Sequence, residues 1–287
     1  MGRTNAVSDT AGAGTRLWGP GPVVVGILNV TPDSFSDGGD YVDPEAAAEH
    51  AAAMLDDGAG IIDVGGESTR PGADPVSPEE EARRVVPVIE RIVAARPGAV
   101  ISVDTYRSST AAAALEAGAG IVNDVTALRG DPRMAAVVAE AGCPVVLMHM
   151  QGEPKTMQSE PRYADVVREV GDFLRSRAEH AVEAGVRREN VVVDPGIGFG
   201  KTVDHNLALL RNLKSVVDLG FAVLVGASRK RFIGSITGVE EAAERVFGTV
   251  ATTVLAYERG ATLFRVHDVR ANCEALAVAE AVVSTPR

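Results

Sequence analysis

The chain alternates short apolar runs with longer segments that carry helical periodicity. Most of the eight apolar runs, rich in Val and Ile, are too continuous to be strands with one face in water. Such runs are typical of parallel strands that are buried on both faces. The predicted strands are Pro22–Leu28, Gly60–Val64, Val100–Val103, Gly120–Val122, Pro144–Met148, Val191–Val193, Ala222–Val225 and Thr262–Phe264.

Helical patterns fill the stretches between these strands. Asp43-Pro44 and Ser77-Pro78-Glu79-Glu80 are helix starts, in which a capping side chain precedes a proline. Pro87 lies inside the second of these helices and is expected to bend it. Further helices are predicted at Arg107–Ala117, Pro132–Ala141, Tyr163–Ala184, Asp204–Asp218, Glu240–Arg259 and Val269–Val283.

Strand and helix therefore alternate eight times, which predicts a parallel sheet. Eight units favour closure into a (β/α)8 TIM barrel of the α/β class, with an open doubly wound sheet as the alternative. No linker divides the chain. We expect one barrel domain over residues 22–287, preceded by a flexible tail at residues 1–21 that is rich in Gly, Ala and Thr.

Polar residues follow the apolar runs as a set. Each one alone is readily explained as a helix cap or turn residue. In a barrel, however, the carboxyl ends of all strands meet at one mouth, where active sites lie. The set therefore predicts an active site made of Asn29, Asp63, Asp104, Asn123, His149, Asp194, Ser228, Arg265 and His267.

Composition narrows the class of protein. Hydrophobic residues make up 46% of the 287, which excludes a disordered chain. The net charge of −11 disfavours binding to nucleic acid or to an anionic membrane. The chain has no apolar run of about 18 residues, its start lacks the apolar region of a signal peptide, and Cys143 and Cys273 show no metal-binding spacing. We expect a soluble cytoplasmic protein.

Two kinds of chemical group meet at the predicted mouth. Asp104, Asn123 and Asp194 suit a flat, nitrogen-rich heterocycle, because a carboxylate pairs in a bidentate way with neighbouring N–H groups. An anion such as a phosphate ester could be bound by Arg70, Lys230, Arg265 and His267.

Further features of the sequence concern the same mouth. Asn29 is a candidate oxygen ligand for Mg²⁺, and Ser228 precedes a short helical stretch whose start suits a second anion. The polar loops at 30–39 and 65–73 are expected to act as lids, with plain surface loops as the alternative. Gly198–Thr202 ends like a phosphate-binding loop, but Pro195 stands where the first glycine belongs, so this motif predicts no phosphate site.

Motifs at these positions resemble dihydropteroate synthase, in order from the first strand to the last. The two longest are Gly26-Ile27-Leu28-Asn29-Val30-Thr31-Pro32-Asp33-Ser34-Phe35-Ser36-Asp37-Gly38-Gly39 and Asp63-Val64-Gly65-Gly66-Glu67-Ser68-Thr69-Arg70-Pro71-Gly72. The others are Ser102-Val103-Asp104-Thr105, Asn123-Asp124-Val125, Asp194-Pro195-Gly196-Ile197-Gly198-Phe199-Gly200-Lys201, Ser228-Arg229-Lys230 and Arg265-Val266-His267-Asp268-Val269.

The resemblance implies an enzyme that joins 4-aminobenzoate to 6-hydroxymethyl-7,8-dihydropterin diphosphate, giving 7,8-dihydropteroate and diphosphate. It implies a pterin pocket made of Asp104, Asn123, Met148, Asp194, Phe199 and Lys230. It places Mg²⁺ at Asn29 and the diphosphate at Arg265 and His267. It places the aminobenzoate near Thr69, Arg70, Pro71 and Ser228. Asp104, Lys230, Arg265 and His267 would be the catalytic residues.

The resemblance also implies a homodimer formed by helices late in the chain, and sensitivity to sulfonamides. Three alternatives remain at this point. They are a methyltetrahydrofolate-dependent methyltransferase, a non-catalytic pterin-binding paralogue, and a phosphosugar aldolase that uses Lys230 as a Schiff base.

Overall fold

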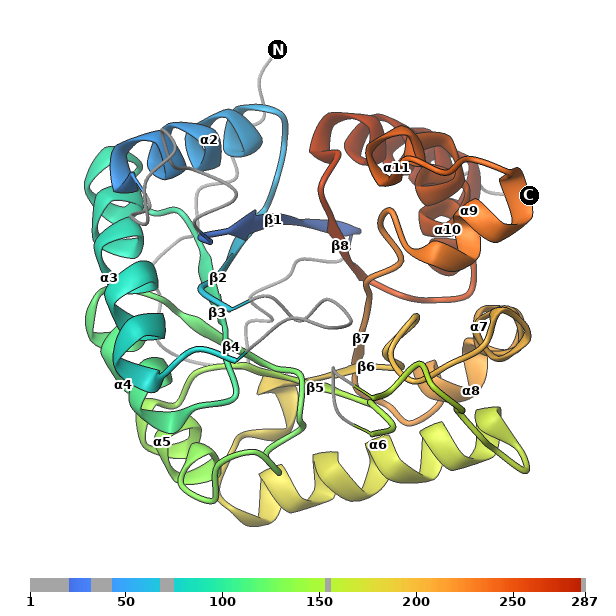
Figure 1. The fold of residues 1–287 in the computed structure, drawn as a ribbon, viewed down its shortest axis with the longest axis horizontal. Helices are drawn as coiled ribbons and strands as arrows, with labels where there is room; N and C mark the ends of the chain where they lie inside the picture. Colours follow the sequence, from blue (N-terminus) through green and yellow to red (C-terminus); the bar gives the residue numbers. More distant parts are fainter. Residues whose placement is uncertain (1–20, 32–42, 68–74, 153–155, 285–287) are drawn as a thin grey trace.

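Eight parallel strands close into a barrel in chain order, with β8 paired to β1 (Figure 1). The computed structural model describes residues 21–31, 43–67, 75–152 and 156–284. The strands are β1 (Val23–Asn29), β2 (Ile61–Gly65), β3 (Ile101–Asp104), β4 (Ile121–Asp124), β5 (Val145–Met148), β6 (Val191–Asp194), β7 (Ala222–Val225) and β8 (Leu263–Val266). The predicted (β/α)8 barrel is confirmed, and the open sheet is excluded. Because residues 1–20 lie outside the description, the tail boundary stays a prediction.

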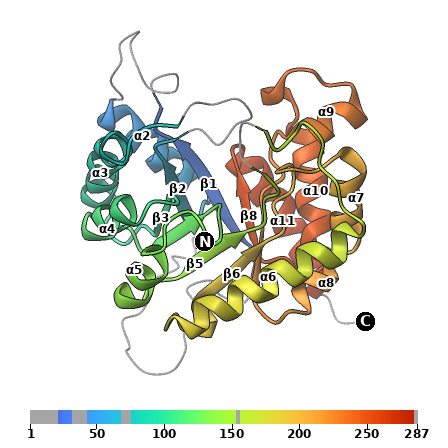
Figure 2. The same cartoon turned by 60° about the horizontal axis from the view of Figure 1, so that its bottom comes forward.

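Helices surround the strands, with α2 to α5 on one side and α9 to α11 on the opposite side (Figure 2). The α-helices are α2 (Pro44–Asp56), α3 (Pro78–Ala95), α4 (Ser108–Glu116), α5 (Met134–Ala141), α6 (Val166–Glu183), α7 (Val203–Arg211), α8 (Lys214–Val217), α9 (Arg231–Thr237), α10 (Val246–Glu258) and α11 (Val269–Ser284). Two short 3-10 helices are η1 (Arg188–Asn190) and η2 (Ala242–Glu244). Asp43 and Ser77 cap α2 and α3 as expected, and α3 continues through Pro87.

The helix predicted over Asp204–Asp218 is two helices in the structure, α7 and α8. The side-chain amide of Asn212 donates to the carbonyl of Ala208, and the Ser215 hydroxyl donates to the carbonyl of Asn212. Such local side-chain bonds compete with the helical backbone pattern and end a helix. The predicted Glu240–Arg259 helix is likewise two elements in the structure, η2 and α10.

Successive side chains of each strand point alternately outward and inward, so the barrel has two separate hydrophobic cores. Residues such as Ile62, Val64 and Val103 face outward and pack under the helices in the main core. The inward residues below the mouth form a second apolar cluster, to which seven strands each contribute one residue: Val25, Ile61, Ile121, Val146, Val192, Leu224 and Leu263. This cluster closes the barrel interior from below. The next inward residues, two positions further along each strand, lie at the mouth.

Candidate active site

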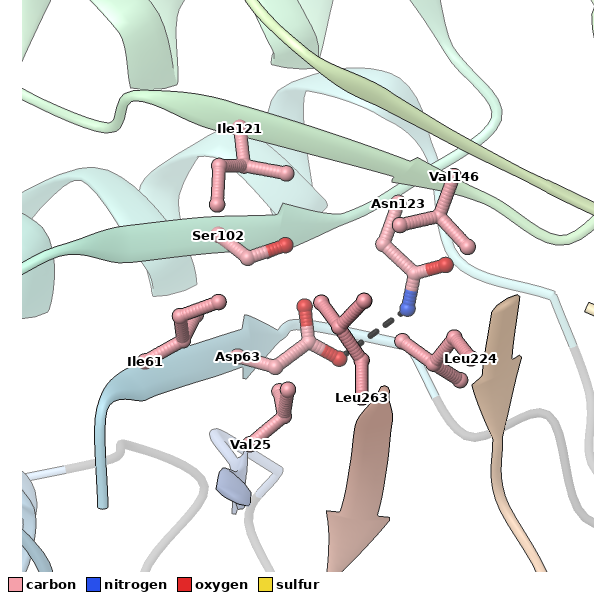
Figure 3. Close-up of a pocket in the computed structure, with 9 residues that line it drawn as sticks. All are labelled: Val25, Ile61, Asp63, Ser102, Ile121, Asn123, Val146, Leu224 and Leu263. Carbon is pink, nitrogen blue, oxygen red and sulfur yellow. Dashed lines mark hydrogen bonds between the residues drawn. The ribbon is translucent and has the colours of Figure 1, made fainter. Parts of the chain in front are cut away.

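A polar layer lies directly above the apolar floor of the barrel. Asp63 and Asn123 follow Ile61 and Ile121 by two residues on the inward side, and Ser102 comes from β3 between them. All three side chains are buried. Figure 3 shows the Asp63 carboxylate between Ser102 and Asn123, and the Asn123 amide donates to Asp63 Oδ2 at 3.1 Å.

Arg265 links this layer to the mouth. Its Nε donates to Asp63 Oδ2 at 2.6 Å, and its Nη2 donates to Asp104 Oδ2 at 2.7 Å. One guanidinium from β8 therefore binds carboxylates from β2 and β3 across the barrel, and Asp63 Oδ2 accepts from both Arg265 and Asn123. Asp63 Oδ1 makes no hydrogen bond within the described part of the chain. Three of the five N–H groups of the guanidinium remain without a partner among the described residues, so they can bind an anion.

Burial and the neighbouring charges shift the pKa values of Asp104 and Arg265. Burial raises the pKa of Asp104 to about 7; the Arg265 cation opposes this shift, whereas the nearby Asp63 charge adds to it. Burial alone would lower the pKa of Arg265, but the charges of Asp63 and Asp104 outweigh it and raise that pKa. Arg265 is therefore a permanent cation, and Asp104 can exist with or without its proton near neutral pH.

Asp194 and Lys230 form the second half of the mouth. Asp194 Oδ1 accepts from the backbone N–H of Gly196 at 2.7 Å. Burial raises the pKa of Asp194, and the Lys230 cation opposes that shift. Lys230 Nζ donates to the carbonyl of Ile197 and lies 4.3 Å from the centre of the Phe199 ring. Burial lowers the pKa of Lys230 to about 7, although the Asp194 charge counteracts it.

An apolar wall stands beside these charges. Met148 belongs to a small buried cluster with Val125, Met150 and Met157, against which the half-buried Phe199 packs. Methionine and an aromatic ring together suit the faces of a flat ring system. The structure thus brings six predicted residues into one region: Asp104, Asn123, Met148, Asp194, Phe199 and Lys230.

Ser228 and His267 lie together at the ends of β7 and β8. Ser228 Oγ is 2.9 Å from His267 Nδ1 and accepts from the His267 backbone N–H at 3.2 Å. The next residue, Arg229, has a positive φ of 58°, and its guanidinium pairs with Asp268. That ion pair joins the two loops and stabilises the Ser228–His267 contact.

Asn29 is the last residue of β1 and is half-buried at the same end of the barrel. It pairs in register with Gly65 of β2. No group of three or more His, Cys, Asp or Glu side chains suited to a metal ion occurs in the part of the chain that the structure describes. A single amide oxygen is an adequate protein ligand only for an ion held mainly by substrate oxygens and water, as Mg²⁺ often is.

Thr69, Arg70 and Pro71 lie outside the described residues, as does most of the loop at 30–39. The two ends of the second loop are described, however. Glu67 Oε2 accepts from the Val76 N–H at 3.0 Å, and Arg107 Nη2 donates both to Glu67 Oε2 and to the Val76 carbonyl at 2.7 Å. Arg107, a residue without a role in the sequence analysis, thus brings together the two ends of the segment that contains these three positions.

Comparison with known proteins identifies the class first. A family model described as "Pterin binding enzyme" matches residues 25–267, which span all eight strands. The chain is therefore a pterin-binding enzyme built on a TIM barrel.

Individual relatives show to which family of pterin-binding enzymes the chain belongs. Dihydropteroate synthase of Neisseria meningitidis is 47% identical over 266 residues, covering 91% of this chain and 93% of the relative. A Xanthomonas albilineans dihydropteroate synthase structure with 4-aminobenzoic acid is 50% identical with a TM-score of 0.87, covering 93% of this chain and 95% of that one. A structure of the Xanthomonas albilineans enzyme in complex with 7,8-dihydropteroate is 47% identical with a TM-score of 0.84, and it covers the same shares of the two chains. The chain belongs to the dihydropteroate synthase family, and not to the methyltransferase, non-catalytic or aldolase classes.

Proposed function

We propose that this enzyme condenses 6-hydroxymethyl-7,8-dihydropterin diphosphate with 4-aminobenzoate, giving 7,8-dihydropteroate and diphosphate in folate biosynthesis. One observation carries the proposal. A carboxylate–amide set for a heterocycle lies directly beside a permanently cationic guanidinium that has N–H groups to spare. A ring recognised by hydrogen bonds and an anionic leaving group are the two parts of this substrate.

The pterin ring is proposed to bind where Asp104, Asn123 and Asp194 converge. Its ring N–H and amino groups are donors, which two carboxylates and an amide oxygen can accept. Met148 and Phe199 would contact the ring faces, and Lys230 would donate to a ring acceptor. Because these side chains are held by hydrogen bonds or packed in the buried cluster, little reorganisation is needed on binding.

The diphosphate is proposed to bind at Arg265 and His267. Mg²⁺, with Asn29 as its protein ligand, would neutralise part of the diphosphate charge. The C–O bond between the pterin methylene and the diphosphate then breaks, and the amine nitrogen of aminobenzoate forms the new C–N bond and loses a proton. No protein nucleophile is required, so the residues act by position and charge.

Aminobenzoate is proposed to lie next to Ser228, with Thr69, Arg70 and Pro71 completing its site. Support comes from the 2.9 Å contact between Ser228 Oγ and His267 Nδ1, since His267 is proposed to bind the diphosphate. Among the described residues, no helix is long and apolar enough to cross a membrane. A cytoplasmic location, with no nucleic-acid or membrane partner, stays part of the proposal.

Asp104→Asn is expected to raise the pterin KM by about 10- to 100-fold, because one charged hydrogen-bond acceptor is lost. The aminobenzoate KM should change little. Diphosphate release measures turnover, and calorimetry with 6-hydroxymethylpterin measures binding. Asp172→Asn on the exposed face of α6 is the matched control and should behave as wild type. Unchanged pterin affinity in Asp104→Asn would refute the role, and a wild-type enzyme without aminobenzoate-dependent diphosphate release would refute the reaction.

Sulfonamides are expected to inhibit competitively with aminobenzoate, since both are para-substituted anilines with an acidic or anionic group. The second-loop motif through Gly72, which carries no insertion, motivates this expectation. Initial rates at several aminobenzoate concentrations give the pattern. Turnover that a sulfonamide fails to inhibit at aminobenzoate concentrations near KM would contradict it.

A homodimer is proposed through α10 and α11. Phe247 is 87% exposed, and Val278 and Val282 lie 67% and 70% exposed one turn apart on α11. Val278 and Val282 also line a groove between the two helices. Large exposed apolar side chains on adjacent helices are typical of a subunit interface.

Sedimentation velocity is expected to give a dimer at micromolar concentrations, and Val282→Glu should shift the protein toward monomer. Val182→Glu makes the same change on α6, at a valine that is 36% exposed; it is the control and should stay dimeric. A wild-type monomer would contradict the proposal.

A further inference from the structure

Lys201 is a buried lysine with no role in the reaction described above. It ends the loop that follows β6, and its side chain is only 3% exposed. Burying an ammonium group is costly unless its N–H groups are bound. Because the Gly198–Thr202 segment has no phosphate-loop spacing, the sequence offered no reason for a lysine here. The reason is found in its contacts.

Burial lowers the pKa of Lys201 to about 7, although the Asp194 charge counteracts this shift. In its protonated form the side chain has three N–H donors, and three acceptors lie around it. Nζ lies 3.0 Å from His149 Nδ1, 2.9 Å from the carbonyl of Phe199 and 3.4 Å from the carbonyl of His149. His149 is itself buried, and burial together with the Lys201 charge lowers its pKa to about 3. The imidazole is therefore neutral, and its Nδ1 can accept from the ammonium. The lysine cross-links the segment after β5 to the loop after β6.

The segment after β5 and the loop after β6 are in direct backbone contact where Lys201 joins them. A Cβ at Gly196 would lie 1.9 Å from the carbonyl oxygen of His149, and one at Gly200 would lie 2.4 Å from that of Gln151. Both glycines have positive φ, of 64° and 60°. The His149 N–H also donates to the Asp194 carbonyl. The loop is thus packed directly against the end of β5, and Lys201 holds the loop there.

Phe199 is the residue that this arrangement positions. Its carbonyl is bound by Lys201, and its ring lies over Lys230 Nζ and against the methionine cluster. We propose that Lys201 is a positioning residue, which fixes the backbone of Phe199 so that its ring and Lys230 form the wall of the pterin pocket. This inference rests on the proposed function, because it concerns the pterin site of that reaction.

The other side chains that hold the loop act at different points. The Tyr163 hydroxyl donates to the Gly200 carbonyl at 2.8 Å, and Asn206 Oδ1 accepts from the Gly198 N–H at 2.7 Å. Neither contacts Phe199 through these bonds. Removing Lys201 frees the Phe199 carbonyl, and it also takes away a cation that favours the charged form of Asp194. Removing the Tyr163 hydroxyl leaves both of these in place and loosens the loop one residue further on.

The test compares Lys201→Met with Tyr163→Phe in the full-length enzyme. Methionine keeps the length and apolar volume of the lysine but donates no hydrogen bond. Lys201→Met is expected to raise the pterin KM and the dissociation constant of 6-hydroxymethylpterin about tenfold or more, with kcat within about threefold of wild type and the aminobenzoate KM unchanged. Tyr163→Phe should change the pterin KM by less than about twofold.

A folded Lys201→Met enzyme with wild-type pterin affinity would overturn the inference, as would equal effects of the two variants. His149→Phe is made in parallel, and it also serves if Lys201→Met does not fold. It leaves the lysine cation in place, which separates positioning from the effect of the charge on Asp194. It keeps a ring against Phe173 and removes one of the three acceptors. It should raise the pterin KM about threefold, and no change would again overturn the inference. Wild-type synthesis of dihydropteroate in the same assay separates these outcomes from a failure of the proposed function.

Discussion

The rest of the site depends on the ion pairs that the Arg265 guanidinium makes with Asp63 and Asp104. Asp63 and Asp104 project into the same barrel interior, and two charged carboxylates there would repel each other in a poorly solvated space. Arg265 binds both, at 2.6 and 2.7 Å, and Asp63 in turn fixes the amide of Asn123. One cation thereby sets the positions of three groups, from β2, β3 and β4.

The loop after β6 contributes to the site in a different way. Three of its backbone polar groups are bound by side chains outside the loop: Lys230 binds Ile197, Asn206 binds Gly198 and Tyr163 binds Gly200. A fourth, the carbonyl of Phe199, is bound by Lys201 at the end of the loop itself. A connecting segment held at so many points behaves as part of the scaffold and not as a mobile loop. Charges fixed within the barrel and an apolar wall fixed by the loop are what a reaction without a protein nucleophile requires.

Eight continuous apolar runs that alternate with helical patterns are sufficient to predict the barrel. The polar residues that directly follow these runs predict its mouth, with Asp104, Asn123, Asp194 and Arg265 at strand ends, because the carboxyl ends of all strands meet there. The sequence pattern does not predict which side chains pair across the barrel. The position of a residue along its strand fixes its level in the barrel and whether it points inward, but not which residue of a distant strand it contacts. From the sequence, Asp63 is therefore one of the strand-end residues without a specific role, Arg107 has no functional role, and Lys201 ends one of the resembling motifs without a role of its own. Helix ends shifted for a related reason, because the Asn212 and Ser215 side chains act locally against the periodic pattern.

The order of the heterocycle site depends on Arg265 and Asp63 acting as one unit. A double-mutant cycle with Asp63→Asn and Arg265→Lys, measured as the binding free energy of 6-hydroxymethylpterin, tests it directly. Strong non-additivity is expected: the double variant should bind about as weakly as the weaker single variant, with a coupling energy above about 1 kcal/mol. Losses that add within about 0.5 kcal/mol would show instead that the two residues act independently.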